Sequence, residues 1–398
     1  MFKTLSLVIA LWSILIAPAA TAQGEGGDAK PTIAFVNTEI LRTYQVAEAA
    51  IIQTLAANGF LTKEEGAALF GVYLAGQLTG SPSEPEDLAG ERVNLFWENA
   101  GGDLSSLNLV LDTVLDREPD ILITVTDRVT QVALNATLNM DDPPAIIFVM
   151  AYNPYLAGIA QTRCIKPEHV IGVESIAPYD EIMRLLRLQK PDLQVIGTIY
   201  SLPDASSLYG AERITALAEE MGISVKQAGV TQIADLRAAT TSLLEADIEM
   251  LVLPIDVVTG PGLPIIMSAA VEHDVPVLYS HIAGAGYATI GAGSAKMFEE
   301  GYYAGQLLAA HLKGEIDIAG TSIVSHASMG IGLNMDVASM QGIEFAEELV
   351  AMADVIIENG RASFASEDTR LGLYQPDPGT APLDLDSVRC TPEMIAEQ

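Results

Sequence analysis

The sequence predicts an α/β protein made of two doubly wound lobes, each a parallel sheet with crossover helices. Apolar, β-branched runs recur along the 398-residue chain, and each is followed by a stretch with helical spacing. The runs form two consecutive series of similar size. The expected strands are residues 32–37, 92–98, 120–126 and 145–151 in the first series, and 170–173, 194–200, 224–230, 250–255 and 276–280 in the second. Each series predicts one lobe.

The segments that follow the second series predict a chain that crosses between the lobes more than once. They are strand-like runs at 287–292 and 321–327, a helix at 299–315 and a short element at 337–343. Such pieces complete two sheets only if the chain returns, and repeated crossings form a hinge. The expected organisation is a signal peptide at 1–22, a first lobe of 31–152 plus 288–323 with an insertion at 61–90, a second lobe of 153–287 plus 324–360, and an acidic, proline-containing tail at 361–398.

The insertion at 61–90 interrupts the alternation of strands and helices. It combines a helix-like part with a linker rich in proline, serine and glutamate. Two interpretations stay open: a surface insertion that lengthens the first crossover, or an element on which a partner docks.

The charge of the chain excludes one class of partner. With 20 Lys+Arg against 52 Asp+Glu, the formal net charge is -32, which repels the phosphates of nucleic acids. The excess of carboxylates is typical of a solvated surface in salty surroundings. We expect the melting temperature to rise with added salt, because ions screen the repulsion among these carboxylates. Thermal unfolding over a salt series checks this, and a flat or falling response would refute it.

The N-terminus predicts export. A positively charged start at residues 1–3, an apolar run at 5–16 and the small residues Ala20 to Ala22 form a secretory signal peptide with cleavage near Ala22. The alternative, an uncleaved membrane anchor, would need an apolar run of about 20 residues. No cysteine follows the expected cleavage site, so the pattern predicts a periplasmic or extracellular protein without a lipid anchor.

The two cysteines, Cys164 and Cys390, both lie in the exported part. An oxidising compartment permits them to pair, and a disulfide would tether the tail in which Cys390 lies. The alternative is two unrelated free thiols.

Signatures of catalysis are missing from the sequence. The five histidines show no metal-site spacing, and no Gly-x-Ser-x-Gly elbow occurs. The glycine-rich stretch 284–296 matches neither the dinucleotide fingerprint nor the phosphate-binding loop. We therefore expect no enzymatic activity, no metal site and no cofactor.

Small polar and aromatic residues follow the predicted strands, at the edge where doubly wound sheets bind ligands. Hydroxyls and helix N-terminal amides suit a carboxylate, aromatic faces suit an apolar body, and an acid suits an amine. Helix capping is an alternative role for Thr126, Asp127 and Ser207. The candidate ligand-binding residues are Asn37, Thr126, Asp127, Tyr152, Tyr200, Ser206, Ser207, Asp256 and Ser280.

The second half of the chain resembles a known family. Residues 170–207, 251–258, 275–281, 287–315 and 331–343 resemble, in that order, the extracytoplasmic substrate-binding proteins of ABC transporters associated with tryptophan and tyrosine uptake. The resemblance implies a type I periplasmic-binding-protein fold, a ligand held between two lobes, delivery to a membrane permease and no enzymatic activity. It also implies that Ser206 and Ser207 meet a ligand carboxylate and that Asp256 is the family's acid. Val257 departs from the asparagine usual after that acid.

These observations predict a monomeric, exported binding protein of an ABC importer. It would close on a small amino-acid-like ligand, aromatic ones included, and deliver it to a permease. Asp256 would pair with an ammonium, and Tyr152 or Tyr200 would cover the side chain. The alternative is a sensory module that reports ligand occupancy to a membrane receptor.

Overall fold

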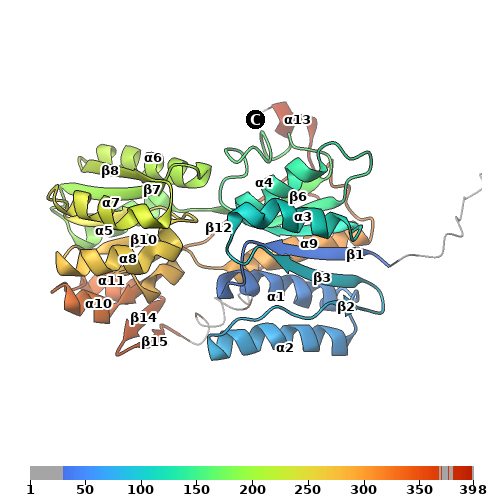
Figure 1. The fold of residues 1–398 in the computed structure, drawn as a ribbon, viewed down its shortest axis with the longest axis horizontal. Helices are drawn as coiled ribbons and strands as arrows, with labels where there is room; N and C mark the ends of the chain where they lie inside the picture. Colours follow the sequence, from blue (N-terminus) through green and yellow to red (C-terminus); the bar gives the residue numbers. More distant parts are fainter. Residues whose placement is uncertain (1–29, 367–368, 370–374, 376–379, 397–398) are drawn as a thin grey trace, which may run out of the picture. The chain divides into compact units, whose positions relative to one another are not determined.

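The computed structural model describes residues 30–366, 369, 375 and 380–396 (Figure 1). The chain divides into two units, Met1–Lys30 and Pro31–Gln398, and the fold described below belongs to the second. The predicted signal peptide at 1–22 lies outside the described residues. In the part of the chain that is described, no helix is both long enough and apolar enough to cross a membrane.

The first sheet has seven strands in the order β12-β6-β5-β4-β1-β3-β2. All neighbours pair in parallel except β2 and β3, which are antiparallel. The strands are β1 (Thr32–Asn37), β2 (Leu88–Ala89), β3 (Asn94–Asn99), β4 (Ile121–Val125), β5 (Ala145–Ala151), β6 (Val170–Ile176) and β12 (Val324–Ala327).

The second sheet has eight strands in the order β15-β14-β13-β11-β10-β9-β7-β8. Its pairs are parallel from β8 to β11, and antiparallel at β11–β13 and β14–β15. The strands are β7 (Val195–Ser201), β8 (Ser224–Val230), β9 (Met250–Leu253), β10 (Val277–His281), β11 (Ile290–Ser294), β13 (Gly330–Asn334), β14 (Val355–Glu358) and β15 (Arg361–Phe364). The two doubly wound sheets confirm the predicted fold class.

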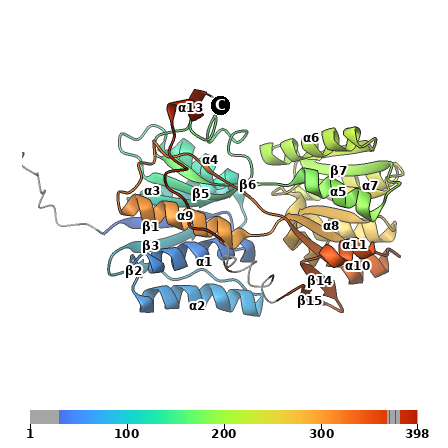
Figure 2. The same cartoon turned by 180° about the vertical axis from the view of Figure 1, so that it is seen from behind.

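Helices cover both faces of each sheet (Figures 1 and 2). Helices α1, α2 and α9 pack on one face of the first sheet, and α3 and α4 on the other. On the second sheet, α5, α6 and α11 lie opposite α7 and α8. The bounds are α1 (Arg42–Ala57), α2 (Lys63–Thr79), α3 (Leu107–Leu115), α4 (Thr126–Thr137), α5 (Tyr179–Gln189), α6 (Ala205–Glu220), α7 (Leu236–Leu244), α8 (Thr259–Glu272), α9 (Met297–Leu312), α10 (Met335–Met340), α11 (Glu347–Met352) and α13 (Pro392–Ala396).

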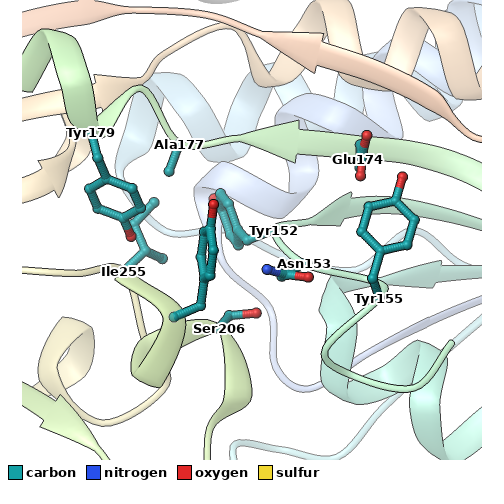
Figure 3. Close-up of a pocket in the computed structure, with 9 residues that line it drawn as sticks. Tyr152, Asn153, Tyr155, Glu174, Ala177, Tyr179, Ser206 and Ile255 are labelled. Carbon is teal, nitrogen blue, oxygen red and sulfur yellow. The ribbon is translucent and has the colours of Figure 1, made fainter. Parts of the chain in front are cut away.

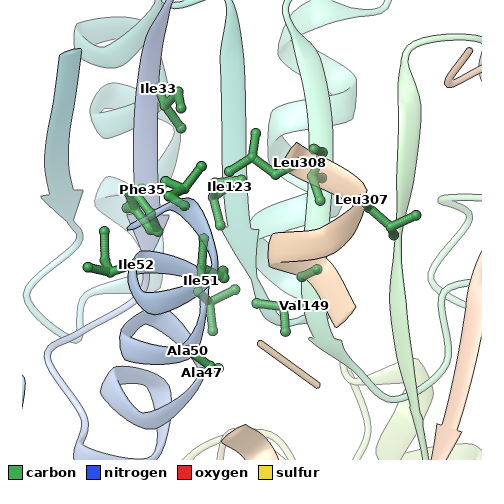
Figure 4. Close-up of a cluster of buried hydrophobic side chains, with 14 of the residues drawn as sticks. Ile33, Phe35, Ala47, Ala50, Ile51, Ile52, Ile123, Val149, Leu307 and Leu308 are labelled. Atoms are coloured by element: carbon green, nitrogen blue, oxygen red, sulfur yellow. The ribbon is translucent and has the colours of Figure 1, made fainter. Parts of the chain in front are cut away.

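Coverage of both faces explains why the strands are apolar at every position. In β1, Ile33 and Phe35 join the core under α1 and α9 (Figure 4), while Ala34 and Val36 join the core under α3 and α4. Helices α1 and α9 approach each other closely because α9 carries Gly301. A Cβ at this position would lie 2.1 Å from the carbonyl oxygen of Ala47.

The chain passes between the two sheets at three places within residues 170–330. It leaves the first sheet after β6, returns after β11 and crosses again between β12 and β13. The strand 170–176, expected in the second lobe, pairs instead with β5 and β12 of the first sheet. Likewise β11, expected in the first lobe, lies in the second sheet. Strand β12, expected in the second lobe, lies in the first sheet. The lobe boundaries themselves, which strand pairing alone does not define, stay a prediction.

The insertion forms a helical layer over α1. Thr62 and Glu65 make a reciprocal capping box at the start of α2, and Gly80 ends the helix at φ 73°. Tyr73 of α2 is buried, and its hydroxyl accepts a hydrogen bond from Trp97 Nε1 at 3.0 Å. These contacts fit a lengthened crossover, and a role in partner docking stays a prediction.

The predicted disulfide is present. Cys164 and Cys390 are bonded, with Cα atoms 5.8 Å apart and a separation of 226 positions in sequence. Around the bond, Ser322 N donates to Val388 O at 2.7 Å and Cys390 N donates to Gly320 O at 2.8 Å. The first residues of the expected tail form β15 in the second sheet, so the tail runs from that sheet to elements beside the first one.

Candidate functional site

A cavity of about 240 Å³ lies within the unit Pro31–Gln398, where strands of both sheets end. Its walls come from the loops after β5, β6 and β9, from Glu174 of β6 and from the first residues of α5 and α6 (Figure 3). The lining residues are Tyr152, Asn153, Tyr155, Glu174, Ala177, Tyr179, Ser206, Tyr209 and Ile255.

Four tyrosines dominate the walls: Tyr152, Tyr155, Tyr179 and Tyr209. Burial raises the pKa of Tyr152 well above its usual range, with further contributions from Glu300 and other acidic groups nearby. Burial also raises the pKa of Tyr155 and of Tyr179. The hydroxyls of these three therefore stay protonated at neutral pH and can donate hydrogen bonds, while the rings offer apolar faces.

Glu174, at the end of β6, supplies a carboxylate to the cavity. It is 7% exposed, and its Oε1 accepts a hydrogen bond from Ser325 Oγ. The Tyr155 hydroxyl is directed toward it (Figure 3), and the negative field of Glu174 adds to the effect of burial on the pKa of Tyr155. Within the described ranges, no lysine, arginine or histidine forms an ion pair with Glu174.

Asp127, in the first turn of α4, connects elements of both sheets. Its carboxylate accepts hydrogen bonds from Tyr152 N at 2.9 Å, from Asn153 N at 3.2 Å and from Ser206 Oγ at 3.0 Å. Burial raises the pKa of Asp127 to about 6, against the lowering effect of these donors. Since α4 follows β4 of the first sheet and α6 follows β7 of the second, this contact joins the two halves beside the cavity.

Two further aspartates occupy the helix starts of the second sheet. Asp204 Oδ1 accepts hydrogen bonds from Ser206 N at 2.9 Å and Ser207 N at 3.2 Å, which caps α6. Asp256 Oδ1 accepts from Val258 N at 2.6 Å and Thr259 N at 2.5 Å, at the start of α8. Burial raises the pKa of both aspartates.

The sequence comparisons identify the family. A family model described as "ABC transporter substrate binding protein" matches residues 86–357. The chain belongs to this family of ABC transporter substrate-binding proteins. The family is one of solute-binding proteins rather than enzymes. Among curated relatives, the "Tyrosine-binding protein" of Clostridioides difficile (strain R20291) is 21% identical over 226 residues, which are 57% of this chain and 64% of that protein. The match thus spans less than two thirds of that relative.

Solved structures show the same fold. A domain from Streptococcus pneumonia in complex with L-Trp has a TM-score of 0.67 at 17% identity, covering 83% of this chain and 100% of that one. A conserved domain protein from Vibrio cholerae gives the same values. A ligand-free, open substrate-binding protein with adhesive properties from Clostridium difficile has a TM-score of 0.58 at 19% identity, covering 80% and 96%. These likenesses show the type I periplasmic-binding-protein fold.

The substrate-binding protein brings part of the predicted site together. Tyr152 and Ser206 line the cavity, and Asp127 bonds to both. Ser207 and Asp256 form a pair behind it, with Ser207 Oγ donating to Asp256 Oδ2 at 2.8 Å. These contacts give Asp256 a structural role, and its pairing with a ligand ammonium stays a prediction.

The other candidates lie outside the cavity lining. Asn37, at the end of β1, donates to Glu48 Oε1 at 3.0 Å, and Ser280 Oγ donates to Leu253 O at 2.7 Å. Tyr200 lies in β7 opposite Gly229. Thr126 begins α4 at φ 79°, a conformation that is costly for threonine and is found often at functional sites. Ligand roles for these residues stay predictions.

The cavity also contains residues that the sequence did not single out as site residues. Glu174 directly ends an apolar run, which is the signal that singled out Asp256, so it could have been found. Tyr155 lies two residues after Asn153 in the loop that follows β5. Tyr179 is the first residue of α5, and Tyr209 is the fifth residue of α6. An aromatic side chain near a helix start usually packs in the core and carries no separate signal.

Proposed function

We propose that this substrate-binding protein closes on a small amino-acid-like ligand outside the cytoplasm and delivers it to an ABC permease. The observation that supports the proposal is the tyrosine-lined cavity, to which elements of both sheets contribute. The proposal includes a secreted, monomeric protein without enzymatic activity.

The cavity walls suit a small molecule with an aromatic or apolar body. Tyrosine rings bury apolar surface and stack on aromatic groups, while Asn153 and Ser206 add polar contacts that fix orientation. A volume of about 240 Å³ suits a ligand of the size of an aromatic amino acid or amine. The relatives described as tyrosine-binding and as an L-Trp complex support the same class.

Closure would depend on groups from both halves. In this arrangement Ser206 of α6 reaches Asp127 of α4, so the hydrogen bond between them exists only when the halves are together. A ligand that touches Tyr152 from the first sheet and Tyr209 from the second would stabilise the same state.

Calorimetric titration with aromatic and aliphatic amino acids and their amines tests the proposal. We expect binding of at least one aromatic compound, and a loss of roughly tenfold or more in affinity for Tyr152→Ala and Tyr209→Ala, because each ring buries apolar surface against the ligand. Tyr287→Ala is the matched control, since Tyr287 is 57% exposed and lies outside the cavity lining. Absence of binding by every compound would contradict the ligand class.

A further inference from the structure

The positions that would bind an anion beside the cavity are already occupied by the protein's own carboxylates. Backbone N–H groups at strand ends and helix starts are the usual partners of a ligand carboxylate. Here the N–H groups of Tyr152 and Asn153 and the hydroxyl of Ser206 donate to Asp127. A ligand carboxylate would have to compete with Asp127 for these three donors.

The same holds at the two helix starts of the second sheet. The first N–H groups of α6 donate to Asp204, and those at the start of α8 donate to Asp256. All three aspartates are largely buried, so their negative charges are only weakly screened by solvent. Because the N–H groups of these helix starts already bind negatively charged aspartates, the electrostatic field beside them favours a cation in the cavity over an anion.

Basic side chains do not offset these acids at the wall. The nine lining residues, all of them in the described part of the chain, include no lysine, arginine or histidine. Arg128, the basic residue whose field lowers the pKa of Asp204, is exposed and donates to Gln131 Oε1 at 3.0 Å. Arg163, whose positive charge lowers the pKa of Tyr155, donates through Nε to Ile323 O at 3.0 Å.

Glu174 has the environment of a cation-binding carboxylate. It is buried at the cavity wall, where it accepts a hydrogen bond from the Ser325 hydroxyl and lies beside the Tyr155 hydroxyl, and no ion pair joins it to a described residue. A buried carboxylate without a positive partner is unfavourable, and a ligand ammonium would offset this cost. The four tyrosines around it provide the aromatic faces that attract organic cations.

We propose that the cavity selects organic cations without a free carboxylate, such as aromatic amines, and that Glu174 pairs with the ligand ammonium. An α-amino acid would bring its carboxylate toward Asp127 and Glu174, where like charges repel. This inference rests on the proposed function and narrows its ligand class.

Three probes of one skeleton test the selection by charge. Tyramine carries the ammonium alone, L-tyrosine carries ammonium and carboxylate, and 3-(4-hydroxyphenyl)propionate carries the carboxylate alone. Titration calorimetry of the dialysed protein at pH 7.5 should give a Kd for tyramine about tenfold or more below that for L-tyrosine, and no measurable binding of the propionate. These measurements need no variant.

Two variants assign the selection to Glu174. Glu174→Gln should weaken tyramine binding by about tenfold or more and reduce the ratio between tyramine and L-tyrosine. Glu168→Gln makes the same charge change at the exposed opposite end of β6 and should leave both affinities unchanged. A circular dichroism melt of each variant shows whether it is folded.

The outcomes separate this inference from the proposed function. L-Tyrosine binding as tightly as tyramine, or a folded Glu174→Gln variant that keeps the preference, would overturn the inference and leave the binding function standing. Binding of the propionate alone would also overturn it. If none of these probes and no amino acid or amine binds, the proposed ligand class fails, and this inference fails with it.

Discussion

Replacing Glu300 with glutamine is expected to stabilise the protein by as much as about 3 kcal/mol at pH 8, with little change at pH 4.5. Glu300 lies in the first turn of α9, is 1% exposed and accepts a hydrogen bond from Ser175 Oγ at 2.5 Å. Burial raises the pKa of this carboxyl to about 7 from 4.5; the Ser175 hydroxyl lowers it and the neighbouring Glu299 raises it. Glutamine keeps an oxygen for the serine and removes the charge.

The sign follows from proton binding. Between pH 4.5 and 7 the folded protein holds a proton on Glu300 that the unfolded chain has released, so stability falls as pH rises through this window. The contribution of Glu300 is complete below pH 4.5 and is lost above pH 7. Because a glutamine cannot titrate, the unfolding free energy of the Glu300→Gln variant lacks this dependence on pH.

Other charged groups around Glu300 do not cancel the effect. Tyr152 stays protonated at neutral pH, since its pKa is raised, and burial lowers the pKa of His326. Lys296 forms an ion pair with Glu299, with Nζ 3.2 Å from Oε1. Above pH 7 the charge on Glu300 is therefore stabilised by the hydrogen bond from Ser175, and no ion pair joins Glu300 to another described residue.

Urea unfolding at intervals between pH 4.5 and 8 measures the effect. The difference between Glu300→Gln and wild type should grow through this range. Burial also raises the pKa of Glu48 to about 7, so the Glu48→Gln variant should show the same pH dependence as Glu300→Gln. The exposed Glu315→Gln is the control and should run parallel to wild type. A Glu300→Gln curve that also runs parallel would contradict the prediction.

Periodicity in the sequence predicted the strands well but not their place in a sheet. Residues 32–37, 145–151 and 224–230 are strands with the predicted bounds. The strand at 170–176 was expected in the wrong sheet, because a strand buried on both faces is the same apolar run whichever neighbours it pairs with. Pairing is decided by contacts such as Phe148 against Gly172, which no local pattern reports.

The site shows what the residue after a strand can and cannot indicate. Asp256 and Glu174 each end an apolar run, yet Asp256 is followed within three residues by α8 and accepts N–H groups from its start. After Glu174 the chain crosses to the other sheet, so no nearby helix start satisfies its carboxylate. The distance to the next helix start thus distinguishes an aspartate that caps a helix from a carboxylate at the cavity wall, whose ligand role stays a prediction.

Removal of the disulfide is expected to have the second large effect on stability. Cys390→Ser is expected to lower the unfolding free energy by about 2–4 kcal/mol, because the bond closes a loop of 226 residues and restricts the unfolded chain. It should lower the melting temperature by several degrees, as measured by calorimetry without reductant. Cys164→Ser should give the same change, since both variants remove the same bond.

The tail should also become accessible when the bond is absent. Around Cys390 it is held by the backbone hydrogen bonds of Val388 and Cys390 and by the buried Val388 side chain. Because these few contacts contribute a small part of the total unfolding free energy, the tail segment around Cys390 can open locally while the sheets stay folded. Trypsin should then cleave after Arg389 in Cys390→Ser much faster than in wild type.

Adding a reductant distinguishes the effect of losing the disulfide from the effect of substituting a cysteine side chain. Dithiothreitol should make wild type as sensitive to trypsin as Cys390→Ser and should change neither cysteine variant further. Ser387→Ala is the control within the tail, because the Ser387 hydroxyl donates to Asp384 O in its own turn. Equal cleavage of oxidised wild type and Cys390→Ser would mean that the backbone pairing at residues 320–322, rather than the disulfide, holds the tail in place.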